Sequence, residues 1–267
     1  HFYDIHCGNC LEMSPAITCN QRCLHCWRDT SVFSSGWTEE IDDPKEIIQG
    51  CIEARRKLMI GFKGNENVDL VKFENYLIPD HAAISLTGEP CMYPRLPELV
   101  DSFFDDFNFR TVFLVTNGTM PEVLKKFGKD SKHFPTNLYM SLEAFDSDSY
   151  QKFNNPVSTD TWNNIQESMK YLSTIKDKTK TILRITAVKK FNMEKAKEFV
   201  KFIELMQPTH IEIKGYGFLG YSRKRMQEEN VPEWNEVIDF SKELAELTGY
   251  SITEEHEPST VIQLSVL

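Results

Sequence analysis

The sequence predicts an α/β protein with a parallel sheet that curves into a full or partial barrel. Segments with strand and helix character alternate along the chain from about residue 40 onward, and this order is typical of parallel strands joined by helical crossovers. The predicted strands are apolar on one face and polar or charged on the other. An open doubly wound sheet buries both faces and has near-continuous apolar strands, so the alternation favours a barrel with a wet interior.

The individual elements follow from periodicity and boundary residues. In the stretch IDDPKEIIQGCIEARRKLM, Asp43 can cap a helix, Pro44 suits its first turn, and apolar residues recur at helical spacing. Other helices are predicted over residues 95–106, 121–128, 146–153, 160–175, 193–206 and 233–248. Strands are predicted over residues 11–18, 81–88, 111–118, 137–144, 181–188, 210–218, 250–255 and 260–267. Residues 60–80 are the least regular and are expected to form a flap over a site, and one domain is expected over residues 1–267.

Polar side chains gather on one face of the later strands. On this face lie Tyr139, Ser141, Glu143, Arg184, Thr186, Glu212 and Lys214. Active sites of barrels form at the carboxyl ends of the strands, so this face is expected to line a ligand cavity. A second interpretation remains open, in which Arg184 or Lys214 pairs with Glu143 or Glu212, because buried charges need partners.

The composition is that of an ordinary globular chain, with 40% hydrophobic and 26% charged residues. The net charge of −10 disfavours a general nucleic-acid binder, although a local basic patch is compatible with it. Basic clusters at 176–180, 188–190 and 221–225 are either such patches or solvated loops and helix ends. No apolar run approaches the roughly 18 residues that span a bilayer, and no signal peptide is recognisable. The chain begins at His1, so we expect that residues before it have been trimmed or are not represented in the sequence.

The stretch AITCNQRCLHCWRD holds Cys19, Cys23 and Cys26 in the spacing C-x3-C-x2-C. Five of the seven cysteines lie in the first 26 residues, and this clustering favours metal binding in a reducing compartment, the cytoplasm, over a disulfide framework. Structural zinc takes four ligands, and plant-type ferredoxins use C-x4-C-x2-C with a distant fourth cysteine. Three thiolates on a cubane cluster instead leave one iron open for a small molecule. Cys51 and Cys91 are expected to be packing residues.

The cysteine motif after the first strand, together with LTGEP at 86–90, resembles the signature of radical S-adenosylmethionine (radical SAM) enzymes. The resemblance implies a partial (β/α)6 TIM-like barrel with extra C-terminal strands, a 4Fe-4S cluster on Cys19, Cys23 and Cys26, and S-adenosyl-L-methionine on the open iron. One electron from the cluster would cleave that cofactor to a 5′-deoxyadenosyl radical. By position, the cofactor-binding residues would be Thr87, Gly88, Glu89, Asn117, Ser141, Glu143, Arg184, Lys214, Gly215 and Tyr216. His25 fills the aromatic position of the motif and is not expected to be a catalytic base.

Longer stretches resemble the tRNA 4-demethylwyosine synthases of wybutosine biosynthesis, namely CLEMSPAITCNQRCLHCWRD, SLTGEPCMYPRLPELV and IEIKGYGFLGYSRKRM. The resemblance implies a lyase that condenses N1-methylguanosine at position 37 of tRNA-Phe with two carbons of pyruvate. It also implies an electron donor of flavodoxin or ferredoxin type and a second 4Fe-4S cluster, with Cys10 as one ligand and Cys7 as an alternative. The other two ligands and a pyruvate-binding lysine are expected before His1, so no catalytic residue is assigned within the chain.

A tRNA substrate requires contacts to phosphates and a base that leaves its stack. The candidate contacts are Lys63 in the expected flap, Arg223, Lys224, Arg225, and Trp27 with Arg28 beside the cysteines. We expect charge reversal at Arg223 and Arg225 to weaken tRNA binding and to leave cofactor cleavage intact. Rival interpretations are a different radical SAM enzyme, such as a glycyl-radical activase, and a non-catalytic iron–sulfur module that binds tRNA.

Overall fold

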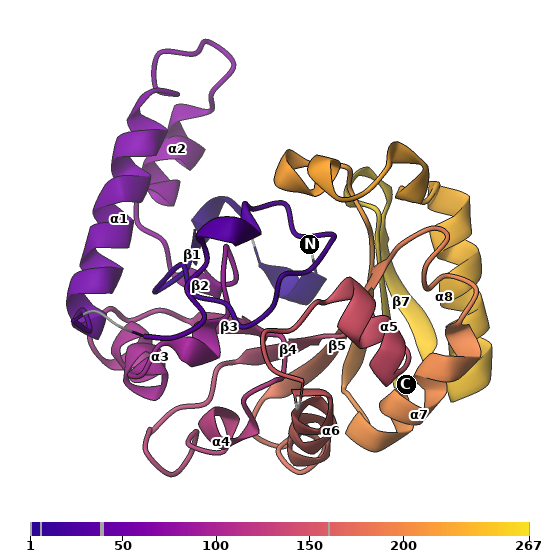
Figure 1. Cartoon of the computed structure of the whole chain (residues 1–267). Coiled ribbons are helices and arrows are strands. Elements are labelled where there is room, and N and C mark those ends of the chain that lie inside the picture. Colours follow the sequence, from indigo (N-terminus) through magenta and orange to yellow (C-terminus); the bar gives the residue numbers. More distant parts are fainter. Residues whose placement is uncertain (1, 6, 38–39, 160, 267) are drawn as a thin grey trace.

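The computed structural model describes residues 2–5, 7–37, 40–159 and 161–266 of the chain, which carry one curved sheet of eight strands in the order β1-β2-β3-β4-β5-β6-β8-β7. Six strands pair in parallel: β1 (Cys10–Met13), β2 (His81–Ile84), β3 (Thr111–Thr116), β4 (Asn137–Ser141), β5 (Lys180–Ala187) and β6 (His210–Gly215). Two antiparallel strands then extend the sheet beyond β6: β8 (Val261–Ser265) and β7 (Ser251–His256). Because β1 and β7 are its two edges, the sheet forms a partial barrel, as predicted (Figure 1).

Helices cover the outer face of the curved sheet (Figure 1). They are α3 (Leu96–Asp105), α4 (Pro121–Leu124), α6 (Thr161–Leu172), α7 (Ala196–Met206) and α8 (Trp234–Thr248). A further short helix, α5 (Ser147–Phe153), follows β4, and Asp146 caps it by accepting a bond from the Ser149 amide at 2.7 Å. The crossovers therefore place all loops that follow a parallel strand at one edge of the sheet.

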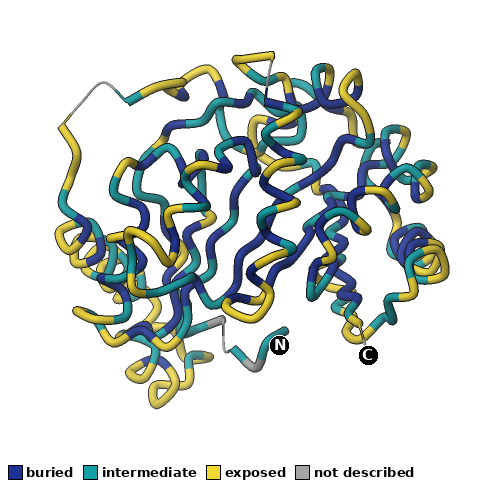
Figure 2. The backbone as a smooth tube through the Cα atoms, turned by 90° about the horizontal axis from the view of Figure 1, so that it is seen from below, coloured by how far each residue is buried: buried dark blue, intermediate teal, exposed yellow. Residues whose placement is uncertain are grey.

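The apolar face of the central strands packs into the core, as the alternation of apolar and polar residues predicts. Leu138 and Met140 of β4, Leu183 of β5 and Ile211 of β6 are fully buried in the core between sheet and helices. Figure 2 shows this layer as a continuous buried band along the strands, with exposed residues at the periphery. The polar partners of these residues in the alternation therefore face the inside of the barrel.

Several predicted strands are longer than the observed ones. Strand β1 ends at Met13 rather than at residue 18, because Pro15 has no amide to donate to the ladder. Strand β4 ends at Ser141 and β6 ends at Gly215. Glu143 therefore lies in the loop after β4 rather than within the strand.

Residues 60–80 do not form the predicted flap. Helix α1 (Pro44–Ile60) runs into a turn, and a second helix, α2 (Leu70–Tyr76), returns beside it. Together they form an arm that projects from the body (Figure 1). Arg55 of α1 donates to the carbonyls of Tyr76 and Gly8, so the base of the arm packs against the N-terminal segment.

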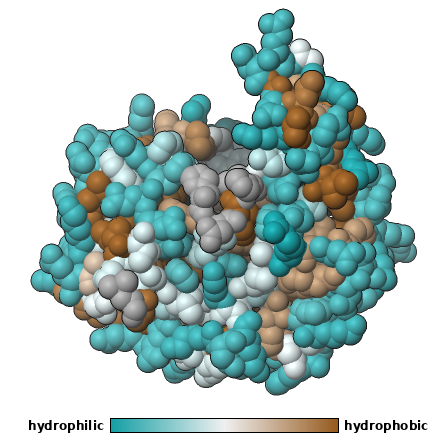
Figure 3. Space-filling model, turned by 180° about the vertical axis from the view of Figure 1, so that it is seen from behind, coloured by the Kyte–Doolittle hydropathy of each residue, from teal (hydrophilic) through white to brown (hydrophobic). Residues whose placement is uncertain are grey.

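The surface is mostly hydrophilic, and the arm carries exposed apolar side chains that show as brown patches in Figure 3. These exposed side chains are Leu58, Ile60, Phe62, Leu70 and Val71. In the part of the chain that the structure describes, no helix combines the length and the apolar character needed to cross a bilayer.

Candidate active site

The three cysteines of the C-x3-C-x2-C motif lie in one irregular loop that follows β1. Backbone bonds tie this loop to its surroundings: the Cys19 amide donates to Ser34 O at 2.9 Å, and the Leu24 amide donates to Phe153 O at 2.9 Å. The guanidinium of Arg22 donates to Cys19 O at 2.7 Å and to Phe33 O at 2.6 Å. The loop is therefore held by α5 and by its own arginine rather than by regular secondary structure.

The loop and the ends of the central strands enclose a cavity of about 200 Å³. Its lining comprises Cys19, Gln21, Cys23, His25, Cys26, Trp27, Phe33, Ser85, Gly88, Glu89, Val115, Thr116, Asn117, Ser141 and Glu143. The structure thus brings the three cysteines together with five of the predicted cofactor-binding residues: Gly88, Glu89, Asn117, Ser141 and Glu143. These side chains come from the ends of β2, β3 and β4, which is where barrel active sites form.

Burial makes the three thiols weaker acids than an exposed cysteine. It raises the pKa of Cys19 to about 12, and it also raises the pKa of Cys23 and of Cys26 above their usual value. As free groups these side chains are neutral, and a bound metal would be needed to keep them as thiolates. Among the described residues, no group of three His, Cys, Asp or Glu side chains is arranged around a single metal ion. A cubane cluster does not require that arrangement, because each thiolate binds a different iron.

Glu89 joins the turn after β2 to the end of β3. Its carboxylate accepts bonds from Thr116 Oγ1 at 2.6 Å, from the Asn117 amide at 2.7 Å and from the Cys91 amide at 3.0 Å. Burial raises the pKa of Glu89, and these three bonds oppose the rise. The preceding residue, Gly88, has a φ of 74°, and a Cβ there would lie 2.5 Å from Thr18 O. Only glycine therefore allows this turn to approach the cysteine loop so closely.

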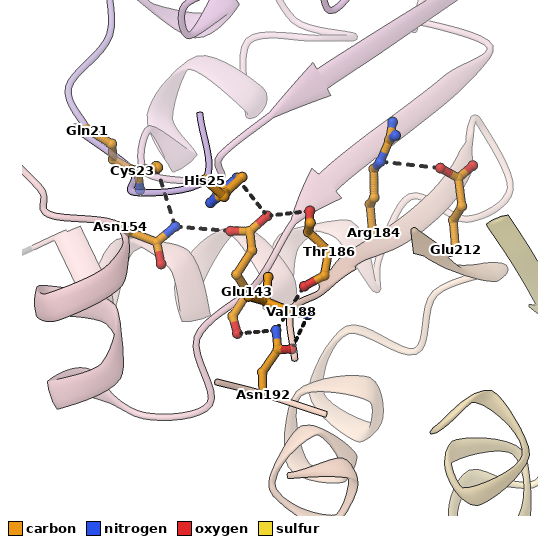
Figure 4. Close-up of polar contacts among 10 residues, drawn as sticks. All are labelled: Gln21, Cys23, His25, Glu143, Asn154, Arg184, Thr186, Val188, Asn192 and Glu212. Atoms are coloured by element: carbon orange, nitrogen blue, oxygen red, sulfur yellow. Dashed lines mark hydrogen bonds and ion pairs between the residues drawn. The ribbon is translucent and has the colours of Figure 1, made fainter. Parts of the chain in front are cut away.

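Glu143 is the centre of a second buried polar network, drawn in Figure 4. It accepts bonds from Asn154 Nδ2 at 3.0 Å and from Thr186 Oγ1 at 3.2 Å, and His25 Nε2 lies 3.7 Å from its Oε1. Asn154 Nδ2 also lies 3.7 Å from Cys23 Sγ, so this network reaches the cysteine loop. Asn192 donates to the Glu143 carbonyl at 3.0 Å and fixes the loop after β4.

His25 packs inside the protein rather than projecting into solvent. Its ring stacks on Phe153 with 5.1 Å between centroids, and burial lowers its pKa, so the imidazole is neutral. Sequence reasoning missed Asn154 and Asn192, which support Glu143. Asn154 follows a helix and Asn192 lies in a turn, and no sequence spacing distinguishes either residue. His25 and Cys23, in contrast, belong to the cysteine motif.

A second cavity of about 350 Å³ lies on the same inner face, towards the amino ends of the strands. Cys10, Glu12, Tyr139 and Glu212 are among the residues of its wall. Here Tyr139 donates to Glu212 at 3.2 Å, and Arg184 Nε lies 3.3 Å from Glu212 Oε1. The interior charges had two interpretations, ligand binding or mutual pairing, and Arg184 pairs with Glu212. Cys7 was the alternative to Cys10, and its side chain lies outside the described part of the chain.

Other predicted cofactor-binding residues do not line the cysteine cavity. Lys214 donates to the Ser259 carbonyl, and Gly215 packs so closely against Thr260 that a Cβ would lie 2.5 Å from Thr260 Cγ2. Tyr216 is buried, and its hydroxyl donates to Ser222 Oγ at 2.9 Å. The Thr87 amide donates to Ser14 Oγ at 2.7 Å, and Thr87 Oγ1 is buried without a partner among the described residues.

The two packing cysteines are placed as predicted. Cys91 is buried in the core, and Cys51 is half-buried on the face of α1 that packs against the core.

The candidate tRNA contacts fall into three groups. Lys63 lies on the arm and pairs with Glu74 at 2.9 Å. Arg223 and Lys224 are exposed on a 3-10 helix, η5 (Gly220–Lys224), beside the cysteine loop. Arg225 differs from them, because its guanidinium is bonded to carbonyls of the cysteine loop itself.

A partial parallel barrel with three cysteines at its carboxyl edge is the fold of one enzyme class, and residues 13–203 match the Radical SAM superfamily. The chain is a radical SAM enzyme, and this class implies a 4Fe-4S cluster and S-adenosyl-L-methionine as cofactors. The fold alone is also shared with coproporphyrinogen III oxidase (HemN) from Escherichia coli, a radical SAM enzyme that is 11% identical with a TM-score of 0.52, over 96% of this chain and 55% of that one.

Within this class, the chain belongs to the tRNA 4-demethylwyosine synthase family. Residues 205–266 match the family described as Wyosine base formation. The S-adenosyl-L-methionine-dependent tRNA 4-demethylwyosine synthase of Pyrococcus abyssi is 41% identical over 265 residues, which are 98% of this chain and 76% of that protein. A solved structure of TYW1 with a lysine-pyruvate adduct bound is 30% identical with a TM-score of 0.85, over 99% of this chain and 82% of that one. The predicted family is confirmed, and its name implies a tRNA substrate.

Proposed function

We propose that this enzyme forms 4-demethylwyosine by joining N1-methylguanosine at position 37 of tRNA-Phe to two carbons of pyruvate, through a 5′-deoxyadenosyl radical. The observation that carries the proposal is the convergence of Cys19, Cys23 and Cys26 with Glu89 and Glu143 on one cavity at the carboxyl edge of the barrel. Membership of the synthase family supports the product, and the lysine-pyruvate adduct in the solved TYW1 structure supports pyruvate as the second substrate.

Cys19, Cys23 and Cys26 are the proposed ligands of the radical SAM cluster. The donor set fits such a group: three thiols line one cavity, and His25 Nδ1 and Asn154 Oδ1 are buried beside it without partners among the described residues. When bound, the cluster supplies the electron that cleaves the cofactor. The chain itself positions the ligands and keeps water from the loop, which is closed on one side by the stacked rings of His25, Phe153 and Phe191.

The residues around the cavity are proposed to orient the cofactor. Glu89 is held by protein donors on both carboxylate oxygens, and its side chain lines the cavity. It is the proposed partner for an ammonium group such as that of the cofactor's methionine part. Glu143 has two protein donors and lines the same cavity, so it is the proposed acceptor for hydroxyl groups of a ribose, with Ser141 beside it on the cavity wall.

The second cavity supports a second 4Fe-4S cluster with Cys10 as one ligand, because Cys10 stands on the wall of an interior space that also receives Tyr139 and Glu212. This position would place the cluster on the same inner face as the radical SAM site. None of the described residues is assigned to pyruvate. A flavodoxin- or ferredoxin-like protein is the proposed electron donor.

Basic and aromatic side chains beside the cysteine loop, most of them exposed, are proposed to bind the tRNA. Arg28 lies 3.8 Å from the centre of the Trp27 ring, and Lys224 lies 4.4 Å from that of Tyr221. Such cation–aromatic pairs combine phosphate attraction with a surface on which a base can stack. Lys63 is less suited to this role, because Glu74 neutralises it.

The test is an anaerobic assay with the full-length protein. We expect protein reconstituted with iron and sulfide, then given dithionite, S-adenosyl-L-methionine, methylated tRNA and pyruvate, to yield 5′-deoxyadenosine and the tricyclic nucleoside in tRNA digests. Cys23→Ala should yield neither product, and Cys51→Ala, which alters a cysteine outside the cavity, should yield both. Deoxyadenosine without the nucleoside would favour another radical SAM substrate, as for a glycyl-radical activase. No deoxyadenosine from cluster-loaded protein would favour a non-catalytic tRNA-binding module.

A further inference from the structure

A segment far along the chain closes over the back of the cysteine loop. The Tyr221 amide donates to Trp27 O at 2.8 Å, which ties η5 to the residue directly after Cys26. Gly220 has a φ of 53°, and a Cβ there would lie 2.3 Å from Trp27 O. The two backbones therefore meet at a distance that only glycine permits.

Arg225, at the end of η5, extends this contact along the loop. Its Nε donates to Leu24 O at 3.2 Å, and its Nη2 donates to Cys26 O and, at 3.3 Å, to Arg28 O. One planar guanidinium thus bonds three carbonyls of residues 24–28, a stretch with no helical or strand ladder of its own. Without it, these partly buried carbonyls would lose their donor, so the backbone on both sides of Cys26 would open more readily.

The guanidinium also places a positive charge beside Cys26. Its Nη2 is bonded to the carbonyl oxygen of that same residue, and its Nε is bonded to Leu24 O. A positive charge held this close would favour a more negative state of a group bound to the Cys26 sulfur. Arg223, two residues earlier, bonds Phe218 O at 2.9 Å instead and gives a matched arginine that does not contact the loop.

We propose that Arg225 is a positioning residue for the radical chemistry: it fixes the backbone around Cys26, and its charge favours the reduced state of the cluster bound there. The inference rests on the proposed cluster at Cys19, Cys23 and Cys26. Arg225 belongs to the Wyosine base formation region at 205–266, whereas the cysteines belong to the Radical SAM region at 13–203. Through Arg225, the region at 205–266 therefore contributes to the cysteine site, which lies in the Radical SAM region at 13–203.

The test compares Arg225→Gln, Arg225→Lys and Arg223→Gln in the full-length protein. Hydrogen exchange of residues 24–28 is measured in iron-free protein, and the midpoint potential of the cluster is measured by EPR-monitored titration. We expect amide exchange in Arg225→Gln to be about tenfold faster at residues 24–28 and its midpoint potential to be lower than that of the wild type. Arg225→Lys should restore the potential but not the exchange, because an ammonium keeps the charge and loses the planar fork. Arg223→Gln should leave both unchanged.

Unchanged exchange and potential in Arg225→Gln would overturn the proposal. If Arg225→Gln fails to bind iron, retention of iron by Arg225→Lys and Arg223→Gln supports it, and loss of iron in Arg223→Gln as well overturns it. If the wild type itself binds no cluster, the proposed function fails, and the exchange comparison still decides whether Arg225 holds the loop.

Discussion

Gly88 lies where the turn after β2 meets the segment that leads into the cysteine loop. Any side chain at this position has two independent costs. The first is the positive φ, and the second is a clash, because a Cβ would lie 2.5 Å from Thr18 O and 3.0 Å from Ala16 O. We expect Gly88→Ala to lower the free energy of unfolding by about 1–3 kcal/mol, measured by urea denaturation. Gly64→Ala is the matched control, because nothing lies within 4 Å of a Cβ at that position. Equal stability of the two variants would show that the turn has room to move.

The same scale explains which site residues sequence reasoning could find. Cys19, Cys23 and Cys26 are marked by spacing within eight residues, and Glu89 is marked by its place after a buried strand. The role of Arg225, in contrast, could not be found from its neighbours in the sequence. Those basic neighbours predicted a phosphate contact, whereas its hydrogen-bond partners lie about 200 residues away. Charge reversal at Arg225 is therefore expected to disturb the cysteine loop as well as tRNA binding, so Arg223 and Lys224 are the residues at which tRNA contact is tested separately. Contacts of this kind follow from the fold and leave no local pattern.

At the scale of elements, periodicity predicted the central strands and helices well, because each is a short amphipathic unit with its apolar face in the core. Strand β3 begins at Thr111 as predicted, and α1 begins at Pro44 after the predicted cap, Asp43. Helix α2 was missed because its apolar Leu70 and Val71 are 52% and 74% exposed, so burial imposes no helical period on them. The flap expected over residues 60–80 is instead half of a helical arm.

The base of that arm depends on one arginine. Arg55 reaches from α1 to the carbonyls of Tyr76 and Gly8, and the Tyr76 ring packs on Gly8, where a Cβ would lie 2.4 Å from it. We expect Arg55→Ala to cost about 1.5–3 kcal/mol of local stability and to speed proteolytic cleavage between α1 and α2, followed by mass spectrometry. Arg56→Ala is the control, because its exposed side chain makes a single, longer contact, 3.4 Å to Leu77 O, and in the described structure does not join α1 to Gly8. Faster cleavage in both variants would mean that charge on α1, rather than the Arg55 bridge, holds the arm.

At the scale of the whole molecule, a chain of net charge −10 has to bind a polyanion. We infer that a local basic patch reconciles the negative net charge with tRNA binding. Arg223, Lys224 and Arg28 lie beside the cysteine loop and form this patch. Attraction within about 8–10 Å survives at physiological salt, whereas the distant negative charges are largely screened. A local patch can therefore outweigh the net charge at the face where the tRNA is proposed to bind.

This view predicts how tRNA affinity depends on salt. We expect Arg223→Glu with Lys224→Glu to weaken tRNA binding and to reduce the slope of log affinity against log salt by about 1.4–1.8, because each of the two lost phosphate contacts releases about 0.7–0.9 fewer counterions. The control is Lys176→Glu with Lys178→Glu, which makes the same change of charge in the turn before β5, at the amino end of the strands. Binding is measured by fluorescence anisotropy at several salt concentrations. An equal loss in the control pair would show that the tRNA responds to total charge. No loss in the first pair would place the tRNA on another face of the barrel. A loss confined to the first pair would put the anticodon over the same loop whose cysteines are proposed to hold the cluster.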